Sequence, residues 1–240
     1  MAIETSVSAF VDDITASLAA WRKGPLLPIV TLVLTAGNVL TLPSHDSFPI
    51  LLARLLLGFF SFGWFGTQFI WYQRAFDGQP IHSRELFPVT WSFIARYVRL
   101  YFLALFPLLV FVFVAVVWHT FTFESPGWRI GVLLLVLVFD IAATFINPAL
   151  AFSTRKVTKA IPIGLRMAAE GWPRNWQYLV VPGVAQAVLG GVYWLVPSAI
   201  RPMPEILITL ISLVFAGAIA RYYLRIPWAH SIGYPGNKTS

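Results

Sequence analysis

The feature that most constrains this chain is an apolar segment at residues 130–152, with a single acid, Asp140, near its centre. A helix needs ~20 such residues to cross the hydrocarbon core of a bilayer. Only 11% of the 240 residues are charged, whereas a soluble domain carries ~25%. Similar apolar segments lie at residues 25–42, 49–72, 100–118, 176–196 and 205–224. The sequence therefore predicts one all-α polytopic domain, residues 1–240, that crosses the bilayer six times.

Three further segments have the apolar spacing of amphipathic helices: residues 4–22, 83–99 and 153–172. Each precedes a pair of predicted spans, so the chain reads as three hairpins, each with a helix lying at the membrane surface. For residues 4–22 the alternative is a short helix packed on other loops. For the repeat, the alternative is that any series of hairpins with basic flanks looks repetitive.

The second span has a side made of small residues, at Gly58, Ser61, Gly63 and Gly66. Small residues let the backbones of two membrane helices approach closely. We therefore expect another helix to pack against this side.

The basic residues are distributed unequally between the two sides of the predicted hairpins. Of the 17 Lys and Arg residues, 14 lie at the termini, in residues 73–99 or in residues 153–175. The positive-inside rule then places both termini in the cytoplasm, with the domain in the plasma (inner) membrane. A basic surface for anionic lipid headgroups or a protein partner is expected on that side. Its residues are Arg84, Arg96, Arg99, Arg155, Lys156, Lys159, Arg166 and Arg174.

Three stretches carry a family resemblance: residues 19–25 (AAWRKGP), residues 78–87 (GQPIHSRELF), and Asn147-Pro148-Ala149-Leu150 with the basic segment that follows to Trp172. In these stretches and in its layout the chain resembles the six-span integral membrane proteins grouped with the membrane domain of glycerophosphoryl diester phosphodiesterases and with YciC-like proteins. In those phosphodiesterases a separate soluble domain carries the catalysis. The resemblance therefore implies a fold and no activity.

Asp140 is the sharpest single candidate for function. An ionisable side chain at mid-span costs ~3 kcal/mol on insertion scales, so Asp140 should face the interior of the bundle or be protonated. We expect it to pair with Arg54, and Gln68, Asn147 and Gln186 could join the same polar network. Asp140 is then either a proton or cation site in a transporter or a hydrogen-bonded pin between helices.

The sequence offers little catalytic or cofactor chemistry. The chain has no cysteine, and none of its four histidines falls within a predicted span, where paired haem ligands would stand. A metal site that joins His45, Asp46, His119 and Glu124 lacks the local spacing typical of metal ligands. We therefore predict no catalytic residues, no metal and no cofactor.

These observations leave three classes of function. The first, which we favour, is a non-enzymatic membrane scaffold or accessory subunit that binds lipid or a partner complex, as a homo-oligomer or within a larger assembly. The second is a transporter or a permease subunit of an ATP-driven exporter, with Asp140 in the translocation path. An intramembrane enzyme acting on lipid is the weakest, because no paired acids or nucleophile–base set converges at one depth. The net charge of +7 fits loops at an anionic leaflet, and no nucleic-acid partner is expected.

Overall fold

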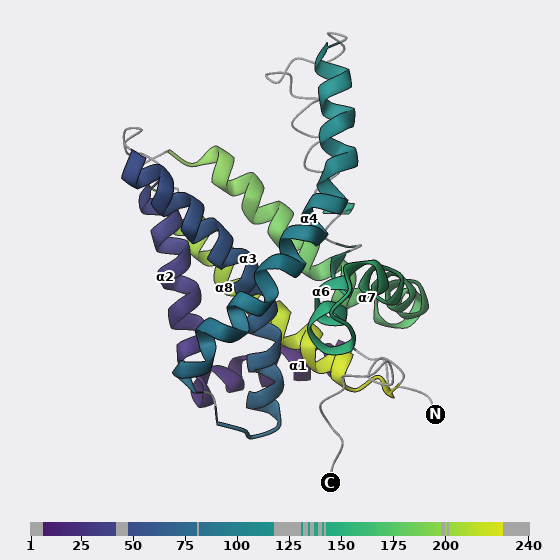
Figure 1. Ribbon diagram of the computed structural model, residues 1–240. Coiled ribbons are helices and arrows are strands. Elements are labelled where there is room, and N and C mark those ends of the chain that lie inside the picture. The colour runs from purple at the N-terminus through teal and green to yellow at the C-terminus, as the bar shows by residue number, and fades with distance from the viewer. Residues whose placement is uncertain are drawn as a thin grey trace.

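The computed structural model describes residues 7–41, 48–80, 82–117, 131, 134, 137, 138, 141, 143–197, 200 and 202–227, and every regular element within them is helical (Figure 1). The predicted all-α class is thus confirmed for this part of the chain. The elements are α1 (Val7–Lys23), α2 (Leu26–Thr41), α3 (Phe48–Phe76), the 3₁₀ turn η1 (Ser83–Glu85), α4 (Leu86–Val117), α6 (Ile146–Pro148), the π-helical turn η2 (Ala149–Ser153), α7 (Val157–Leu195) and α8 (Pro202–Leu224).

Two of the described helices, α3 and α8, are long and apolar enough to cross a membrane. They contain the predicted spans at residues 49–72 and 205–224. Only 12% of the apolar stretch of α3 and 28% of that of α8 is buried, whereas the core helix of a soluble protein is mostly buried. The apolar part of α2, residues 26–37, is shorter. Membrane association therefore rests on two helices, and the full set of six spans is not established.

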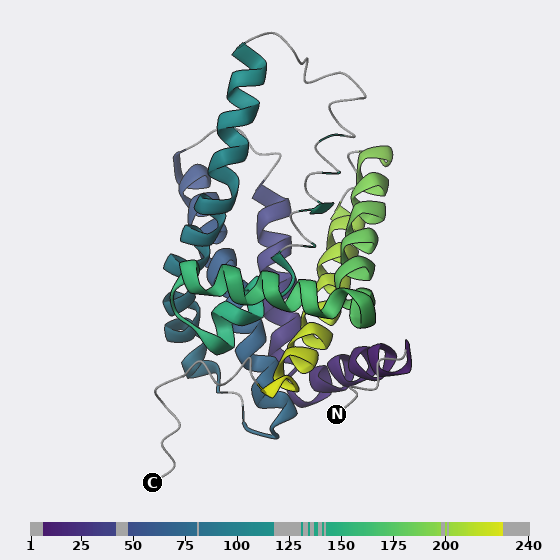
Figure 2. The ribbon, with the colours of Figure 1, turned by 90° about the vertical axis from the view of Figure 1, so that its right-hand side faces the viewer.

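Of two predicted boundaries between a surface helix and a span, one differs from the structure and one is present as a kink. Residues 83–99 and 100–118 were expected as separate helices, but α4 runs without interruption from Leu86 to Val117. No glycine or proline near Arg99 breaks it. The boundary expected between residues 153–172 and the span at 176–196 is confirmed, because the backbone of α7 is non-helical at Asn175, with φ −131° and ψ 30°. Figure 2 shows the first part of α7 and all of α1 running crosswise to the other long helices.

The predicted span at residues 130–152 does not end as a regular α-helix. Residues 144 and 145 form a turn, which α6 and η2 follow. Within η2 the Thr154 amide donates to the Ala149 carbonyl, one residue further back than in an α-helix. Pro148 has no backbone N–H and so cannot continue the regular ladder. Asp140 lies outside the described residues, as do His45, Asp46, His119 and Glu124.

The small-residue side of α3 packs against α4, as expected. A side chain at Gly63 would meet the Thr90 carbonyl, and one at Gly66 would meet the ring of Phe93. Thr67 and Thr90 share a buried hydrogen bond of 2.9 Å at the same contact. Gly58 has nothing within 4 Å of an added Cβ, so the close approach is confined to the second half of α3. α8 lies against α1, α2, α3 and α7, and its second half is part of the buried core.

Candidate functional site

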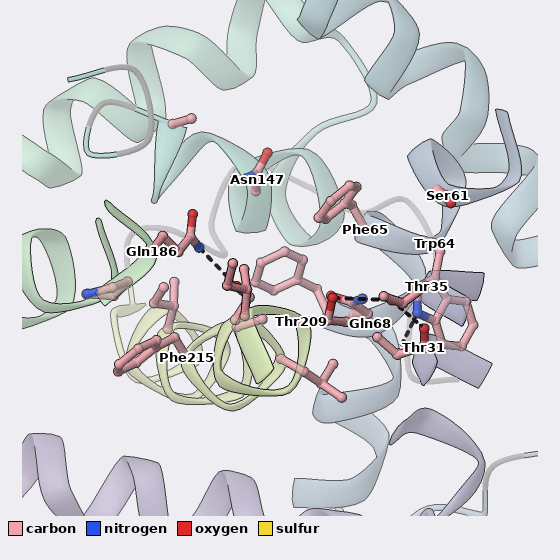
Figure 3. A pocket seen from close by; sticks show the side chains of 18 of the residues that line it. Thr31, Thr35, Ser61, Trp64, Phe65, Gln68, Asn147, Gln186, Thr209 and Phe215 are labelled. Carbon is pink, nitrogen blue, oxygen red and sulfur yellow. Dashed lines mark hydrogen bonds between the residues drawn. The ribbon is translucent and has the colours of Figure 1, made fainter. Parts of the chain in front are cut away.

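A cleft of 440 Å³ opens between α2, α3, α6, α7 and α8, and we call it the interhelical cleft (Figure 3). Its walls combine aromatic rings with hydroxyl and amide side chains. The aromatic rings are those of Trp64, Phe65, Phe69 and Phe215, and the polar side chains include Thr31, Thr35, Ser61, Gln68, Asn147, Gln186, Thr209 and Ser212. Glu205, near the start of α8, also lines it. This volume lies within the ~300–1,000 Å³ typical of small-molecule sites.

Three of the five residues predicted to form a polar network line this cleft. Gln68 comes from α3, Asn147 from α6 and Gln186 from α7, so the tertiary fold brings them to one place (Figure 3). Of Arg54, the structure describes only its place in α3. The expected pairing of Arg54 with Asp140 stays a prediction, because Asp140 lies outside the described residues.

Several of the hydroxyl and amide groups in the cleft hold the helices together. The Thr35 hydroxyl on α2 donates to Thr209 on α8 over 3.2 Å, and the Gln186 amide on α7 donates to Ser212 on α8 over 3.1 Å. The Trp64 indole N–H donates to the Thr31 hydroxyl over 2.8 Å. These contacts bridge α2, α3, α7 and α8, which is the ordinary use of polar side chains between membrane helices.

Other polar groups in the cleft lack such a partner. Gln68 is 6% exposed, yet none of the described residues forms a hydrogen bond with its side-chain amide. Asn147 receives the Tyr97 hydroxyl on its backbone carbonyl, while its side-chain amide has no bond within the described part of the chain. Buried polar groups are nearly always paired with protein, water or a ligand. The Gln68 amide, which faces the open volume of the cleft, therefore takes its hydrogen-bond partner from water or from a ligand.

A second hollow, the basic groove, lies between α4 and the start of α7. Its cations are Arg96 and Arg99 from α4 and Arg155 and Lys156 from the segment before α7. The groove has a volume of 740 Å³, and the described residues that line it include no acid. The Arg96 guanidinium is positioned by the Leu150 carbonyl, to which it donates over 3.4 Å, and by the ring of Phe93.

The basic groove collects four of the eight cations predicted for a basic surface. Of the others, Arg84 lies in η1, and the exposed Arg166 pairs with Glu170 one turn along α7. Lys159 is exposed on the first part of α7 and is not among the residues that line the groove. For Arg174 the structure describes the backbone alone. The single basic surface expected from the sequence is thus divided, and one part of it forms a concave site.

The sequence did not predict a polar cluster around Asp13, which we call the Asp13 cluster. Asp13 of α1 is fully buried, although a charged side chain is usually exposed on an amphipathic helix. Its carboxylate accepts from the Tyr178 hydroxyl over 2.5 Å, pairs with Arg225 and lies 3.5 Å from Arg221. Burial raises the pKa of the Asp13 carboxyl, against the lowering effects of Tyr178, Arg225 and Arg221 and with a small further rise from Asp12.

The two faces of α1 explain this placement. The buried face consists of Phe10, Asp13, Ser17 and Ala20, which recur at helical spacing. Several apolar residues of α1, among them Val7, Val11 and Leu18, are exposed instead. The small size of Ser17 was the signal available, because a small residue permits the close contact with Gly217 of α8.

No protein-family model, no curated protein and no solved structure matches the chain.

Proposed function

We propose that this protein is a non-enzymatic integral membrane protein that binds the phosphate headgroup of an anionic phospholipid in the basic groove. The observation that carries the proposal is the meeting of four cations, Arg96, Arg99, Arg155 and Lys156, from two segments more than 50 residues apart. Without an acid among its described lining residues, the groove attracts anions. The N-terminus of α7, which also faces the groove, adds a favourable dipole.

The apolar surface next to the groove supports a lipid rather than a soluble anion. Phe102 and Leu103 line the groove, and along α4 they are followed by Phe106 and Val110. All four side chains are exposed. A phosphate held by the cations would leave the acyl chains free to lie along this exposed part of α4. Charge at one end and hydrocarbon-compatible surface at the other is the pattern expected for a lipid at the bilayer interface.

The test compares lipids that differ in headgroup charge. The protein would be purified in detergent and titrated with phosphatidylglycerol or phosphatidylcholine, and bound lipid would be counted by native mass spectrometry. Replacing Arg99 and Lys156 together by glutamine should weaken phosphatidylglycerol binding roughly 30-fold, at ~1 kcal/mol for each cation. Arg166→Gln removes a cation outside the groove and should change little. Equal retention of the two lipids by the wild-type protein would refute the proposal.

The proposed topology has six spans, as three hairpins, with both termini and the basic groove on the cytoplasmic side. The exposure of the apolar stretches of α3 and α8 supports a membrane location. The charge bias of the connecting segments supports the orientation. Reporter fusions after residues 80 and 156 should be active only with a cytoplasmic reporter, and activity of an external reporter there would overturn the orientation.

A scaffold is expected to associate with other protein chains in the membrane. We propose that the protein works as a homo-oligomer or as an accessory subunit of a larger membrane complex. Purification in mild detergent followed by mass measurement should then give a particle heavier than one chain of 26.8 kDa with its detergent. A single chain under all mild conditions would speak against this part of the proposal.

Transport is the second candidate, and the polar interhelical cleft favours it. In this alternative Asp140 lies in the translocation path of a transporter or an exporter's permease subunit. A pH- or ion-dependent flux that Asp140→Asn abolishes would support transport. Unchanged flux in that variant, together with lost thermal stability, would assign Asp140 to helix packing.

A further inference from the structure

We propose that the interhelical cleft is a second binding site, distinct from the basic groove, and that it takes an uncharged, hydroxyl-rich group such as a sugar or glycerol moiety. Such a group could belong to a neutral glycolipid or to a free polyol, and the two sources share the same recognition chemistry.

The unpaired amide of Gln68 is the starting point. Gln68 is 6% exposed, lines the cleft and has no hydrogen bond to any described residue. An amide places a donor and an acceptor side by side, and a hydroxyl group offers both in return. Asn147 presents a second amide from α6, across the cleft from α3 (Figure 3). Two such amides suit a ligand with several hydroxyls better than one with a single polar atom.

The charge of the cleft selects against ionised headgroups. Its described lining residues include no Lys, Arg or His, and Glu205 is the one acid among them. A phosphate or carboxylate would be partly desolvated here without a cation to balance its charge, which is costly. Phosphate therefore belongs in the basic groove, whereas a neutral hydroxyl-rich group belongs in the cleft.

The shape and the apolar walls fit the same class of ligand. Trp64, Phe65, Phe69 and Phe215 supply flat aromatic surfaces, and the ring C–H groups of a sugar supply apolar faces that can lie against them. A cleft of 440 Å³ has room for more than isolated waters. Water could also satisfy Gln68, so the experiment must separate a ligand site from a hydrated gap.

The experiment uses the full-length protein in nanodiscs and two probes. One arm replaces part of the phosphatidylcholine with monoglucosyl diacylglycerol, and the other adds free glucose. The readouts are the thermal unfolding midpoint and, for the lipid, native mass spectrometry of retained molecules. A response in the first arm alone identifies a lipid headgroup, and a response to glucose identifies a free polyol. Either response supports the site, provided that it depends on Gln68.

Gln68→Leu tests that dependence, because leucine keeps a similar volume and removes the amide. We expect roughly tenfold weaker binding of whichever probe responds, the size of one hydrogen bond. Gln73→Leu, on the same helix but outside the lining of the cleft, is the matched control and should bind normally. If Gln68→Leu does not fold, Gln68→Met removes the same amide with a more adaptable side chain.

Two results would overturn the proposal. One is the absence of any response to either probe in the wild-type protein, which would leave the cleft as a water-filled gap. The other is a response that persists unchanged in Gln68→Leu or Gln68→Met. Neither result affects the basic groove, because the proposal for the groove depends on anionic lipid and on Arg99 and Lys156.

Discussion

The Asp13 cluster and the interhelical cleft both bury polar side chains, but they satisfy them differently. Asp13 has Tyr178 and two arginines around it, drawn from α7 and from the end of α8. Gln68 is almost as deeply buried and has no described partner. One oxygen of Asp13, Oδ1, is buried without a hydrogen bond and lies 3.5 Å from Arg221, so charge as well as hydrogen bonding holds this cluster together. The Gln68 amide instead faces the open volume of the cleft, where water or the proposed ligand can reach it.

The same comparison explains what holds α1 to the rest of the molecule. The Asp13 cluster and the close contact of Ser17 with Gly217 both tie this crosswise helix to α8. The other side of α1 exposes the apolar residues Val7, Val11 and Leu18. A helix fixed in this way can expose an apolar face without detaching from the rest of the molecule.

The largest effect is expected when Asp13 is removed. Asp13→Ala leaves the Tyr178 hydroxyl and two arginines without their acceptor, and we expect a loss of about 3 kcal/mol in unfolding free energy, at the low end for a broken buried pair because both arginines still reach water. Urea unfolding in detergent micelles would measure it. Asp12→Ala, which removes the exposed carboxylate next to Asp13 in the sequence, is the control. Equal losses of unfolding free energy from both variants would mean that the contacts of Asp13 contribute no more to stability than the exposed Asp12 does.

A smaller loss is expected from Gly217→Ala. The added methyl group would collide with the Ser17 hydroxyl and the ring of Tyr72, and such overpacking costs about 2 kcal/mol. Gly190→Ala, in α7, meets nothing within 4 Å and should instead gain up to ~1 kcal/mol from helix propensity. The same unfolding assay compares the two. A neutral Gly217→Ala would mean that α1 is held by its charges and not by close packing.

The two glutamines of the cleft should respond with opposite signs in the absence of ligand. Gln186→Leu breaks the bond to Ser212 and should cost about 1 kcal/mol. Gln68→Leu removes an unpaired amide and should leave the stability unchanged or raise it slightly. Thermal unfolding of the two variants beside the wild type decides this. A clear loss of stability in Gln68→Leu would show that its amide already has a structural partner.

The smallest effect is a pH dependence at Asp13. Because burial raises the pKa of this carboxyl above its ordinary value of 3.8, its stabilising contribution is fully present below that value and is lost as the pH rises through the folded-state pKa. The unfolding free energy of the wild type should therefore fall between acid and neutral pH relative to that of Asp13→Asn, which has no carboxyl to titrate. A wild type that gains stability relative to Asp13→Asn as the pH rises would mean that the arginines outweigh burial.

The sequence predicted what depends on neighbouring residues along the chain. The helical class, the apolar stretches of α3 and α8, and the small side of α3 at Gly63 and Gly66 all follow from composition and helical spacing. The predicted surface helix at residues 153–172 also appears, as the first part of α7 before the kink at Asn175. Each of these features depends on the residues of a single segment, so the sequence of that segment is enough to predict it.

The sequence did not predict how distant polar groups are shared among the helices. Gln68, Asn147 and Gln186 were expected in one network. The sequence could not predict that Gln186 is hydrogen-bonded to Ser212 whereas Gln68 has no hydrogen bond to a described residue. The burial of Asp13 could not be read from the sequence, because its partners Tyr178 and Arg225 lie more than 160 residues away. Four of eight expected basic residues entered one groove because α4 meets the start of α7.

By itself, then, the sequence determined that this chain forms apolar helices with basic connecting segments, since hydrophobic periodicity and charge are properties of single segments. The tertiary structure alone decided which polar groups are paired, which are buried without a partner and which cations converge. The physical reason is that hydrogen bonding and desolvation depend on the whole surroundings of a group, and those surroundings come from helices that only folding brings together.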